Sequence, residues 1–316
     1  MNFKDDKHGM RGRARVAICA SFACVYLLSF LVFVCDGKNL HAAEPQAKGV
    51  WSAGRLNDWF RSRYSAAGVW DIGGQFRIRP EIKDAGSFPS RDFIHAAGGA
   101  NNYFLLRTMV HLGWSPSSWF SCYVEGRDAQ ELSDSRTVPE SDDFDLHQAY
   151  LRLGDPAKFP VSLKIGRQEL SYGDQRYIGN SDWSNYRRSF DALRLRWGKN
   201  GFWLDAFVAR PVPVKDDGFN RPNGNELFSG VYSGTKRIFR WQESHFYFLA
   251  HNVGSGATNQ TPRDIYTVGV LLKSIKEKLG PWDYGFEIAG QFGNIQQNDR
   301  QLRHRSYAVN ATVGHT

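Results

Sequence analysis

One short stretch, GRQELSYGDQRYIG from Gly166 to Gly179, gathers side chains that could do chemistry. It begins like a β-strand and then presents Arg167, Glu169, Asp174 and Arg176 beside two tyrosines. Residues of these types could form a catalytic loop, a metal site, or the lining of a passage for a charged molecule. The elements that position them decide among these three.

The dominant pattern along the chain is an alternation of apolar and polar residues with period two, which is typical of β-strands. In residues 75–83, Phe76 and Ile78 face one way, while Arg77 and Arg79 face the other. The same alternation recurs in residues 103–114, 120–127, 148–153, 193–197 and 284–292. Helical periodicity is passable at Leu271–Leu279. We therefore expect an all-β fold of about twelve strands, without a second domain.

The connections between these strands are sorted by length. Long ones are expected at 84–101, 128–143, 171–189, 211–227 and 251–264, short ones at 115–118, 154–160, 198–201 and 234–237, and intermediate ones at 273–281 and 296–304. Outer-membrane barrels have short periplasmic turns and longer outer loops. Trp114, Trp119 and Trp197 lie beside short turns, where an aromatic girdle would meet the membrane interface. The pattern predicts a transmembrane antiparallel β-barrel over residues 69–316.

The first residues have the pattern of a secretory signal peptide. Basic residues precede the apolar run Val16–Cys35, and the small residues Ala42 and Ala43 follow it. An uncleaved membrane anchor is the alternative, because such a run could span a bilayer. We expect residues 1–43 to be the signal, 44–68 a short periplasmic lead-in, and the protein to be in the outer membrane.

Charge and cysteine content exclude several classes of protein. Of 40 basic and 32 acidic residues, six and three lie in residues 1–43, which leaves 34 and 29. Three of the four cysteines also lie there, and Cys122 is left unpaired, so a disulfide scaffold and a cysteine-based zinc site are excluded. The basic residues alternate with apolar ones and do not cluster with stacking aromatics, which disfavours nucleic-acid binding.

The polar faces of the predicted strands would line a lumen, and arginine dominates them. The expected lumen cations are Arg77, Arg79, Arg107, Arg127, Arg152, Lys164, Arg194 and Arg196, with the acids Glu81, Glu125 and Glu287. Arginine stays charged and matches a carboxylate with two donors, and rings of charged side chains select ions in pores. The alternative is that these arginines merely pair with the acids. In the alternation of its strand, Arg167 lies on the side that would face lipid. Either the strand has left the membrane at this point, or a bulge turns Arg167 inward.

Three strings carry a resemblance to a known family: LKIGRQELSYGDQRYIG, DWSNYRRSFDALRLRW and FVARPV. Over about residues 70–316 the chain resembles the alginate export family of outer-membrane porins. The resemblance implies a monomeric eighteen-stranded barrel with an arginine-rich constriction, which exports an anionic polyuronate. It also implies gating by an inward-folded loop and by periplasmic export proteins. The pore-lining residues that it implies are Arg167, Asp174, Arg176, Arg188, Asp191 and Arg194.

The chain departs from that family in its number of strands. About twelve are visible, and the sequence stops at YAVNATVGHT in what reads as the middle of a strand. An open barrel would leave unpaired backbone groups in lipid. We therefore expect that the C-terminal third is missing. If 316 residues is the true length, closure as a smaller barrel or an oligomer is the alternative.

We predict an anion-selective outer-membrane channel for an acidic polysaccharide such as alginate, without catalytic residues, cofactor or metal. A general porin for small organic anions, or an adhesin, is the second interpretation. An enzyme is the third, because Glu125 with Asp128, or Glu169 with Asp174, could serve as paired carboxylates for glycoside cleavage. Calcium could bind the acidic segment Asp134–Asp145, but its spacing fits no EF-hand loop.

Overall fold

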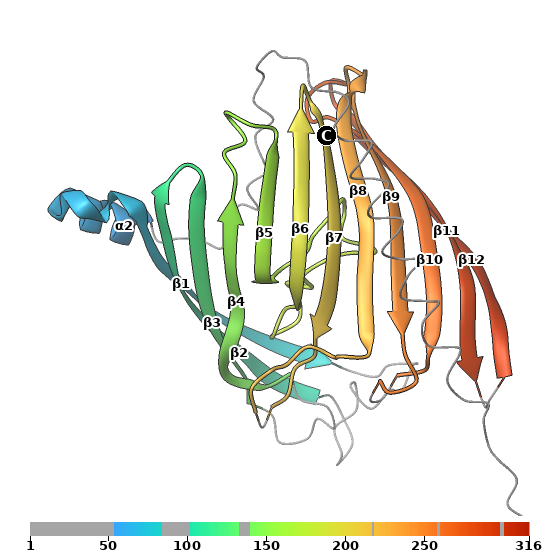
Figure 1. The fold of residues 1–316 in the computed structure, drawn as a ribbon, viewed down its shortest axis with the longest axis horizontal. Helices are drawn as coiled ribbons and strands as arrows, with labels where there is room; N and C mark the ends of the chain where they lie inside the picture. Colours follow the sequence, from blue (N-terminus) through green and yellow to red (C-terminus); the bar gives the residue numbers. More distant parts are fainter. Residues whose placement is uncertain are drawn as a thin grey trace, which may run out of the picture. The chain divides into compact units, whose positions relative to one another are not determined.

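A computed structural model describes residues 54–83, 101–132, 140–216, 218–257, 260–297 and 300–315. These residues form one twelve-stranded antiparallel sheet whose strands follow the order of the sequence (Figure 1). The strands are β1 (Trp70–Lys83), β2 (Asn101–Ser117), β3 (Phe120–Leu132), β4 (Asp142–Leu153), β5 (Val161–Gln168), β6 (Ser189–Lys199), β7 (Phe202–Val212), β8 (Glu226–Phe239), β9 (Gln242–Val253), β10 (Arg263–Ser274), β11 (Trp282–Gln297) and β12 (Arg300–His315). The expected signal at 1–43 lies outside the described residues.

The connections alternate in length, broadly as the sequence predicts. Long ones span 84–100, 133–141, 169–188, 213–225 and 254–262, and short ones span 118–119, 154–160, 200–201 and 240–241. The predicted turn at 234–237 is wrong, because β8 continues through it and Thr235 still pairs with Ser244 of β9. The last connection is shorter than predicted, because Gln297 already pairs with Arg300.

Helix is confined to the segment before β1 in the described part of the chain. The α-helix α2 (Gly54–Arg63) and a short 3-10 helix at Ser65–Val69 lie in the predicted lead-in, where no helix was expected. The sequence of α2 contains few apolar residues, so it gives no clear helical periodicity. Asn57 attaches α2 to β1 by donating to Asp71 Oδ1 (2.5 Å) and accepting from the backbone N–H of Ile72 (2.8 Å). No described helix has the length and apolar character needed to cross a membrane.

The helix predicted at Leu271–Leu279 is also wrong. Residues up to Ser274 belong to β10, which pairs with β9 on one side and β11 on the other, and a turn follows. Two complete ladders of backbone hydrogen bonds outweigh a weak local helical pattern.

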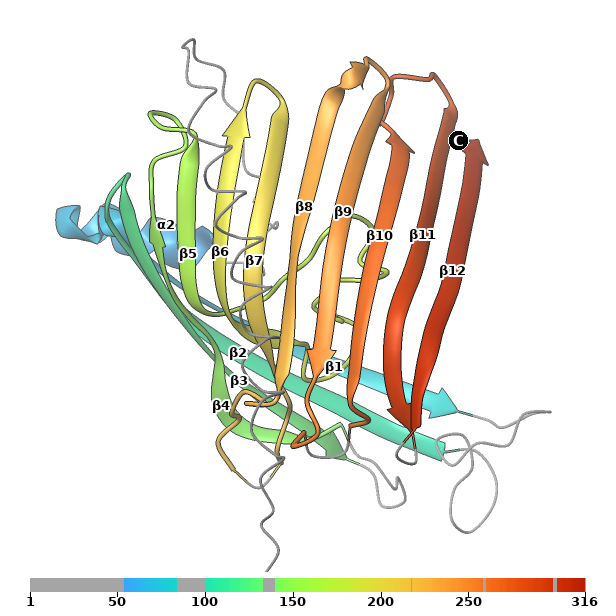
Figure 2. The same ribbon diagram turned by 45° about the vertical axis from the view of Figure 1, so that its right-hand side comes forward.

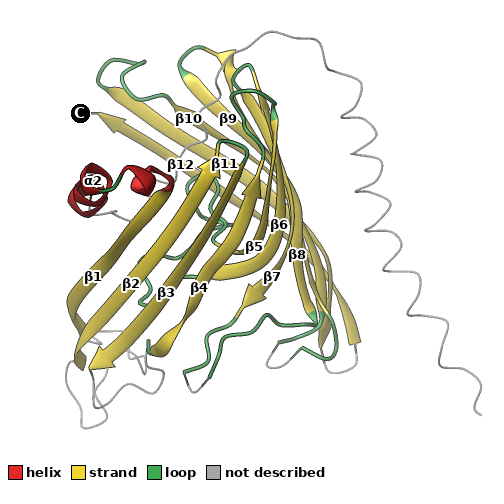
Figure 3. Cartoon of the chain, turned by 60° about the vertical axis from the view of Figure 1, so that its left-hand side comes forward, coloured by secondary structure: helices red, strands yellow, loops and turns green. Residues whose placement is uncertain are grey.

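The two faces of the sheet differ in chemistry as the alternation predicts. Side chains such as Phe76 and Val110 are exposed on the convex face, whereas Arg107 and Glu125 on the concave face are buried. The sheet curves strongly, which defines these two faces (Figures 2 and 3). In the described residues β1 pairs with β2 and β12 with β11, and these two strands do not pair with each other. The antiparallel all-β fold is therefore established, and closure into a barrel stays a prediction.

The connection between β5 and β6, residues 169–188, turns onto the concave face, and we call it the inner loop. Strand β5 is short, so the outer part of β4 has no β5 partner beyond the pair Ala149–Arg167. The inner loop leaves the wall at this point and runs along the concave side, which Figure 3 shows as loop segments inside the curve of the strands. It positions most of the candidate functional residues.

Candidate functional site

Apolar packing holds the inner loop against the sheet. Leu170, Tyr172 and Ile178 are buried in one cluster with residues from β6, β7, β8, β9 and β11. The rings of Tyr172 and Tyr232 stack with centroids 4.6 Å apart. A loop with this much buried apolar surface is part of the core. The family resemblance implies an inward-folded loop, and this segment is a loop that packs on the concave face.

Gly173 makes the close approach of the loop possible. Its φ of 57° lies in the left-handed region that favours glycine. A Cβ at this position would lie 2.6 Å from Tyr232 Oη and 2.8 Å from Leu271 Cδ2. Any side chain here would push the loop away from β8 and β10.

One end of the inner loop is fixed by charged groups that are largely removed from water. Glu169 accepts from Arg187 Nη2 (2.8 Å) and Asn180 Nδ2 (2.7 Å), and its Oε1 lies 2.8 Å from His147 Nε2. Burial would raise the pKa of the Glu169 carboxyl, but the hydrogen bond from His147 and the charge of Arg187 outweigh it and hold the pKa below its usual range. Glu169 is therefore a carboxylate.

The same end of the loop binds the arginines of β1 and β2. Asp182 Oδ1 accepts from Arg107 Nη2 at 2.8 Å, and Arg77 donates to the backbone carbonyls of Asp182 (2.8 Å) and Ser184 (3.1 Å). Burial acts to raise the pKa of the Asp182 carboxyl. The hydrogen bond from Arg107 and the charge of Arg187 outweigh burial and hold the pKa below its usual range. Arg79 also contacts this end of the loop, with its guanidinium 4.2 Å from the ring centre of Trp183.

Asn185 fixes the backbone of this segment. It is fully buried, and its side-chain amide donates to the carbonyl oxygens of Leu106 (3.1 Å), Gln130 (3.2 Å) and Glu140 (3.0 Å). Its own N–H donates to Glu140 Oε2 at 2.5 Å. We call Glu169, Asp182, Asn185 and Arg187 the base of the inner loop.

Arg127 lies behind the base and is not exposed to the concave space. It forms an ion pair with Asp142, and its Nη1 lies 3.0 Å from His147 Nδ1. Asp142 also accepts from Asn220 Nδ2 at 2.9 Å, which ties the β7–β8 connection to the same network. Glu125 is buried nearby and accepts from the Tyr123 hydroxyl at 2.8 Å.

The charged contacts at the other end of the inner loop are fewer, and they are partly exposed. Arg176 Nη1 donates to Glu287 Oε2 (2.8 Å) and Asp174 Oδ2 (3.0 Å), and Lys273 Nζ lies 3.4 Å from Asp174 Oδ1. About a third of the side chains of Arg176 and Asp174 is exposed. The hydrogen bond to Glu287 raises the pKa of the Arg176 guanidinium. We call Asp174 and Arg176 the tip of the inner loop.

Next to the tip, Tyr172 reaches a buried acid that lies among a row of cations near the short turns. The Tyr172 hydroxyl donates to Asp205 Oδ2 at 2.8 Å, and burial raises the pKa of this phenol well above its ordinary value, so it remains a donor. Asp205 is fully buried and accepts two bonds from Arg196, at 2.6 Å and 2.9 Å. Arg194 Nη1 lies 3.9 Å from the same carboxylate.

This cationic row consists of Arg152, Lys164, Arg194 and Arg196. Arg152 stands directly opposite Lys164 across β4 and β5, and Lys164 directly opposite Arg194 across β5 and β6. Lys164 Nζ lies 3.5 Å from the ring centre of Tyr150, which orients the ammonium by a cation–π contact. Like charges directly opposite one another destabilise a sheet. Cations in this register are suited to an anion that binds between them.

Arg167 and Asp191 differ from their expected position on the lumen side. They are register partners on the convex face and form a bidentate ion pair, with distances of 2.8 Å and 3.3 Å. The reason is strand parity, because Arg167 shares the face of Ile165, while Gln168 and Phe190 turn inward. Arg188, also predicted as pore-lining, is exposed at the end of the inner loop.

A comparison with protein families matches residues 69–316 to the family described as alginate export. The match covers more than half of the chain and includes every described strand. The chain belongs to the alginate export family. A comparison with curated proteins finds no match. Membership agrees with the predicted resemblance and with an outer-membrane porin type of protein, since the family is one of transport porins.

Sequence reasoning missed several residues that organise the candidate site. Asp205, Asp182 and His147 become important through partners that tertiary folding brings to them, and their local sequence carries no signal. Glu169 was considered as one of a catalytic pair with Asp174. Its carboxylate instead binds Arg187, Asn180 and His147. Within the described residues no group of three or more metal-ligating side chains occurs, and part of Asp134–Asp145 lies outside them.

Proposed function

We propose that the concave face forms an anion-selective passage for an acidic polysaccharide such as alginate, in the outer membrane. The observation that carries this proposal is the cationic row, in which three cations stand directly opposite one another on adjacent strands. Membership of the alginate export family supports the polyuronate as the anion. A polyuronate carries a carboxylate on each sugar, so it matches closely spaced cations.

The arrangement gives the cations two roles. Arg77, Arg107 and Arg127 bind the base of the inner loop or Asp142, and so they narrow the passage by fixing the loop. The cationic row provides the attraction for carboxylates. Asp205, within the row, limits how tightly one anion is held, and weak binding at each site is what permits conduction.

Single-channel current in planar bilayers tests this proposal. The refolded protein should prefer anions, and an oligouronate should block its current where a neutral oligosaccharide of equal size does not. Replacing Arg152 and Arg194 together by Gln should lower the anion preference and the block several-fold. Arg240→Gln, in the exposed turn at 240–241, is the matched control and should change neither.

Two results would contradict the proposal. Unchanged selectivity in the Arg152→Gln, Arg194→Gln variant would remove the cationic row from the passage. Anion-preferring steps without block by the charged sugar would instead indicate a general porin for small organic anions.

A further inference from the structure

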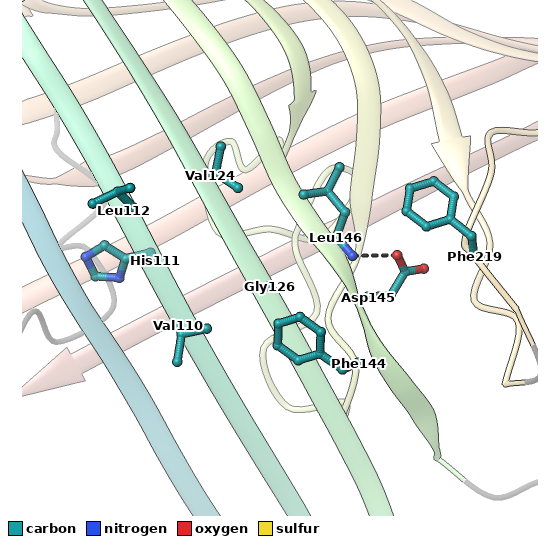
Figure 4. Close-up of a pocket in the computed structure, with 9 residues that line it drawn as sticks. All are labelled: Val110, His111, Leu112, Val124, Gly126, Phe144, Asp145, Leu146 and Phe219. Carbon is teal, nitrogen blue, oxygen red and sulfur yellow. Dashed lines mark hydrogen bonds between the residues drawn. The ribbon is translucent and has the colours of Figure 1, made fainter.

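The two faces of the sheet near β2 differ in the ligands that they could hold. On the convex face, β2, β3 and β4 form a groove lined mainly by apolar side chains, and Figure 4 shows Phe144 lying across β3 at Gly126. The described residues that line this groove include no arginine or lysine. On the concave face, Arg77 of β1 and Arg107 of β2 meet the base of the inner loop. An anion that reaches this part of the sheet therefore finds guanidinium donors on the concave side.

The arginines at the base outnumber the carboxylates that reach them. Arg107 Nη2 donates to Asp182 Oδ1 at 2.8 Å, and Arg187 Nε lies 3.4 Å from the same oxygen. Arg77 donates to backbone carbonyl oxygens. Within the described residues, the ion pairs of these three arginines are with Asp182 and Glu169. Both oxygens of Glu169 are already bonded elsewhere in the base, so Asp182 is the carboxylate that can be exchanged.

The donors at this position are fixed, whereas the acceptor is exposed. The Arg107 side chain is 1% exposed and that of Arg187 is 8% exposed, but the Asp182 side chain is 62% exposed. The Nε atoms of Arg77 and Arg107 are buried and have no hydrogen-bond partner. The guanidinium groups therefore keep unused donor capacity around a carboxylate that can turn into the concave space.

The backbone of the base does not depend on the Asp182 carboxylate. Arg77 binds the carbonyl oxygens of Asp182 and Ser184, and Asn185 binds three further carbonyl oxygens through its side chain. These bonds remain when the Asp182 side chain rotates. An exchange of one carboxylate for another at Arg107 therefore requires no detachment of the inner loop.

We propose that Asp182 occupies a binding site for the carboxylate of a uronate sugar, formed by Arg77, Arg107 and Arg187, and that the polymer displaces it. Both carboxylates accept the same charge-assisted hydrogen bonds from arginine. A competing carboxylate on the same chain weakens the binding of each sugar, and weak binding permits release. When no polymer is present, Asp182 returns, so the buried arginines keep an anion beside them. This inference rests on the proposed function, because it names one site at which the polyuronate is held.

Calorimetric titration of the full chain in detergent with an oligouronate tests the inference. Asp182→Asn removes the competing charge and nearly keeps the shape of the side chain. The Kd of the oligouronate should fall about tenfold, because one charge-assisted hydrogen bond no longer has to be displaced. Asp216→Asn removes a negative charge from an exposed position in the β7–β8 connection. It is the matched control and should bind like the wild type.

Two further variants separate the loss of charge from a loosening of the loop. Asp182→Glu keeps the competing carboxylate and should gain clearly less affinity than Asp182→Asn. Adding Arg77→Gln to Asp182→Asn should remove most of the gain, because the site then lacks one of its cations. An Asp182→Asn protein that binds no more tightly than the wild type would overturn the inference. Equal gains from Asp182→Asn and Asp182→Glu would also overturn it, because a looser loop would then explain the gain.

Block of the single-channel current by the same oligouronate reports on the proposed function separately. If the wild type is blocked but Asp182→Asn leaves the Kd unchanged, the inference is wrong and the passage stands. If Asp182→Asn tightens binding in detergent but no current is blocked, the carboxylate site stands and the passage is wrong.

Discussion

The polar contacts at the two ends of the inner loop differ in how far they are buried. At the base, Asn185 is fully buried and Glu169 is largely buried, and each satisfies several partners at once, whereas Asp182 is mostly exposed. At the tip, the ion pairs of Arg176 with Asp174 and Glu287 are partly exposed. Buried charges are costly to leave unpaired, whereas exposed pairs contribute little and are screened by salt. The charged contacts of the loop are therefore strong at the base and weak at the tip.

This difference suggests how a passage can be narrow and still admit a polymer. A tip that separates from β10 and β11 at small cost would widen the concave space next to the cationic row. A base that stays attached would keep the loop inside. The following changes test whether the two ends are as unequal as their contacts indicate.

The largest effect is expected from Glu169→Gln. This change removes a negative charge that faces Arg187 and His147, and replaces one of the two acceptor oxygens by an NH2 donor, so that one of these groups loses its acceptor. Breaking one partner of a buried ion pair costs roughly 3–5 kcal/mol. We expect a loss of that order in the free energy of unfolding, measured by urea titration of the protein in detergent. Glu277→Gln, in an exposed turn, is the control. A loss no larger than that of the control would mean that the base is not tightly held.

The attachment of the base should weaken in acid. The pKa values of Glu169 and Asp182 are lowered in the folded protein, so their contribution is complete above their ordinary pKa and is lost as the pH falls through the folded values. The partners that face them are Arg187, His147 and Asn180 for Glu169, and Arg107 with Arg187 for Asp182.

Hydrogen exchange of residues 180–187 measures this acid effect. Protection should fall at low pH before the strands lose theirs, and Glu169→Gln should flatten much of the dependence. If the loop and strands β6–β9 lose their protection at the same pH, the base does not titrate separately from the rest of the fold.

The smallest change in stability is expected from Arg176→Gln at the tip. A partly exposed ion pair contributes about 0–1 kcal/mol. The free energy of unfolding should thus change little, while the single-channel current should become larger or less steady as the tip separates more often. Raising the salt concentration should produce the same change in the wild type. If the size and steadiness of the single-channel current are unchanged in the variant, the tip is held by the packing of Tyr172 and Leu170 rather than by its charges.

The sequence by itself determined which residues share a face. Alternation with period two is a property of the extended backbone, and so Arg77, Arg107 and Arg152 could be assigned to the polar face without a structure. The lengths of the connections also follow from strand spacing, apart from the end of β8 and the connection between β11 and β12. The strings around Gly166–Gly179 indicated the family, and the family comparison agrees.

Tertiary structure decided what those arginines do. Arg107 and Arg127 bind Asp182 and Asp142 because the inner loop and the β4 terminus come to them, and no local pattern encodes a partner 75 residues away. The convex position of Arg167 depends on where β5 ends, and α2 depends on hydrogen bonds that Asn57 makes to β1. A face is set by backbone geometry within a few residues, whereas the partner of a charge is set by how distant segments pack.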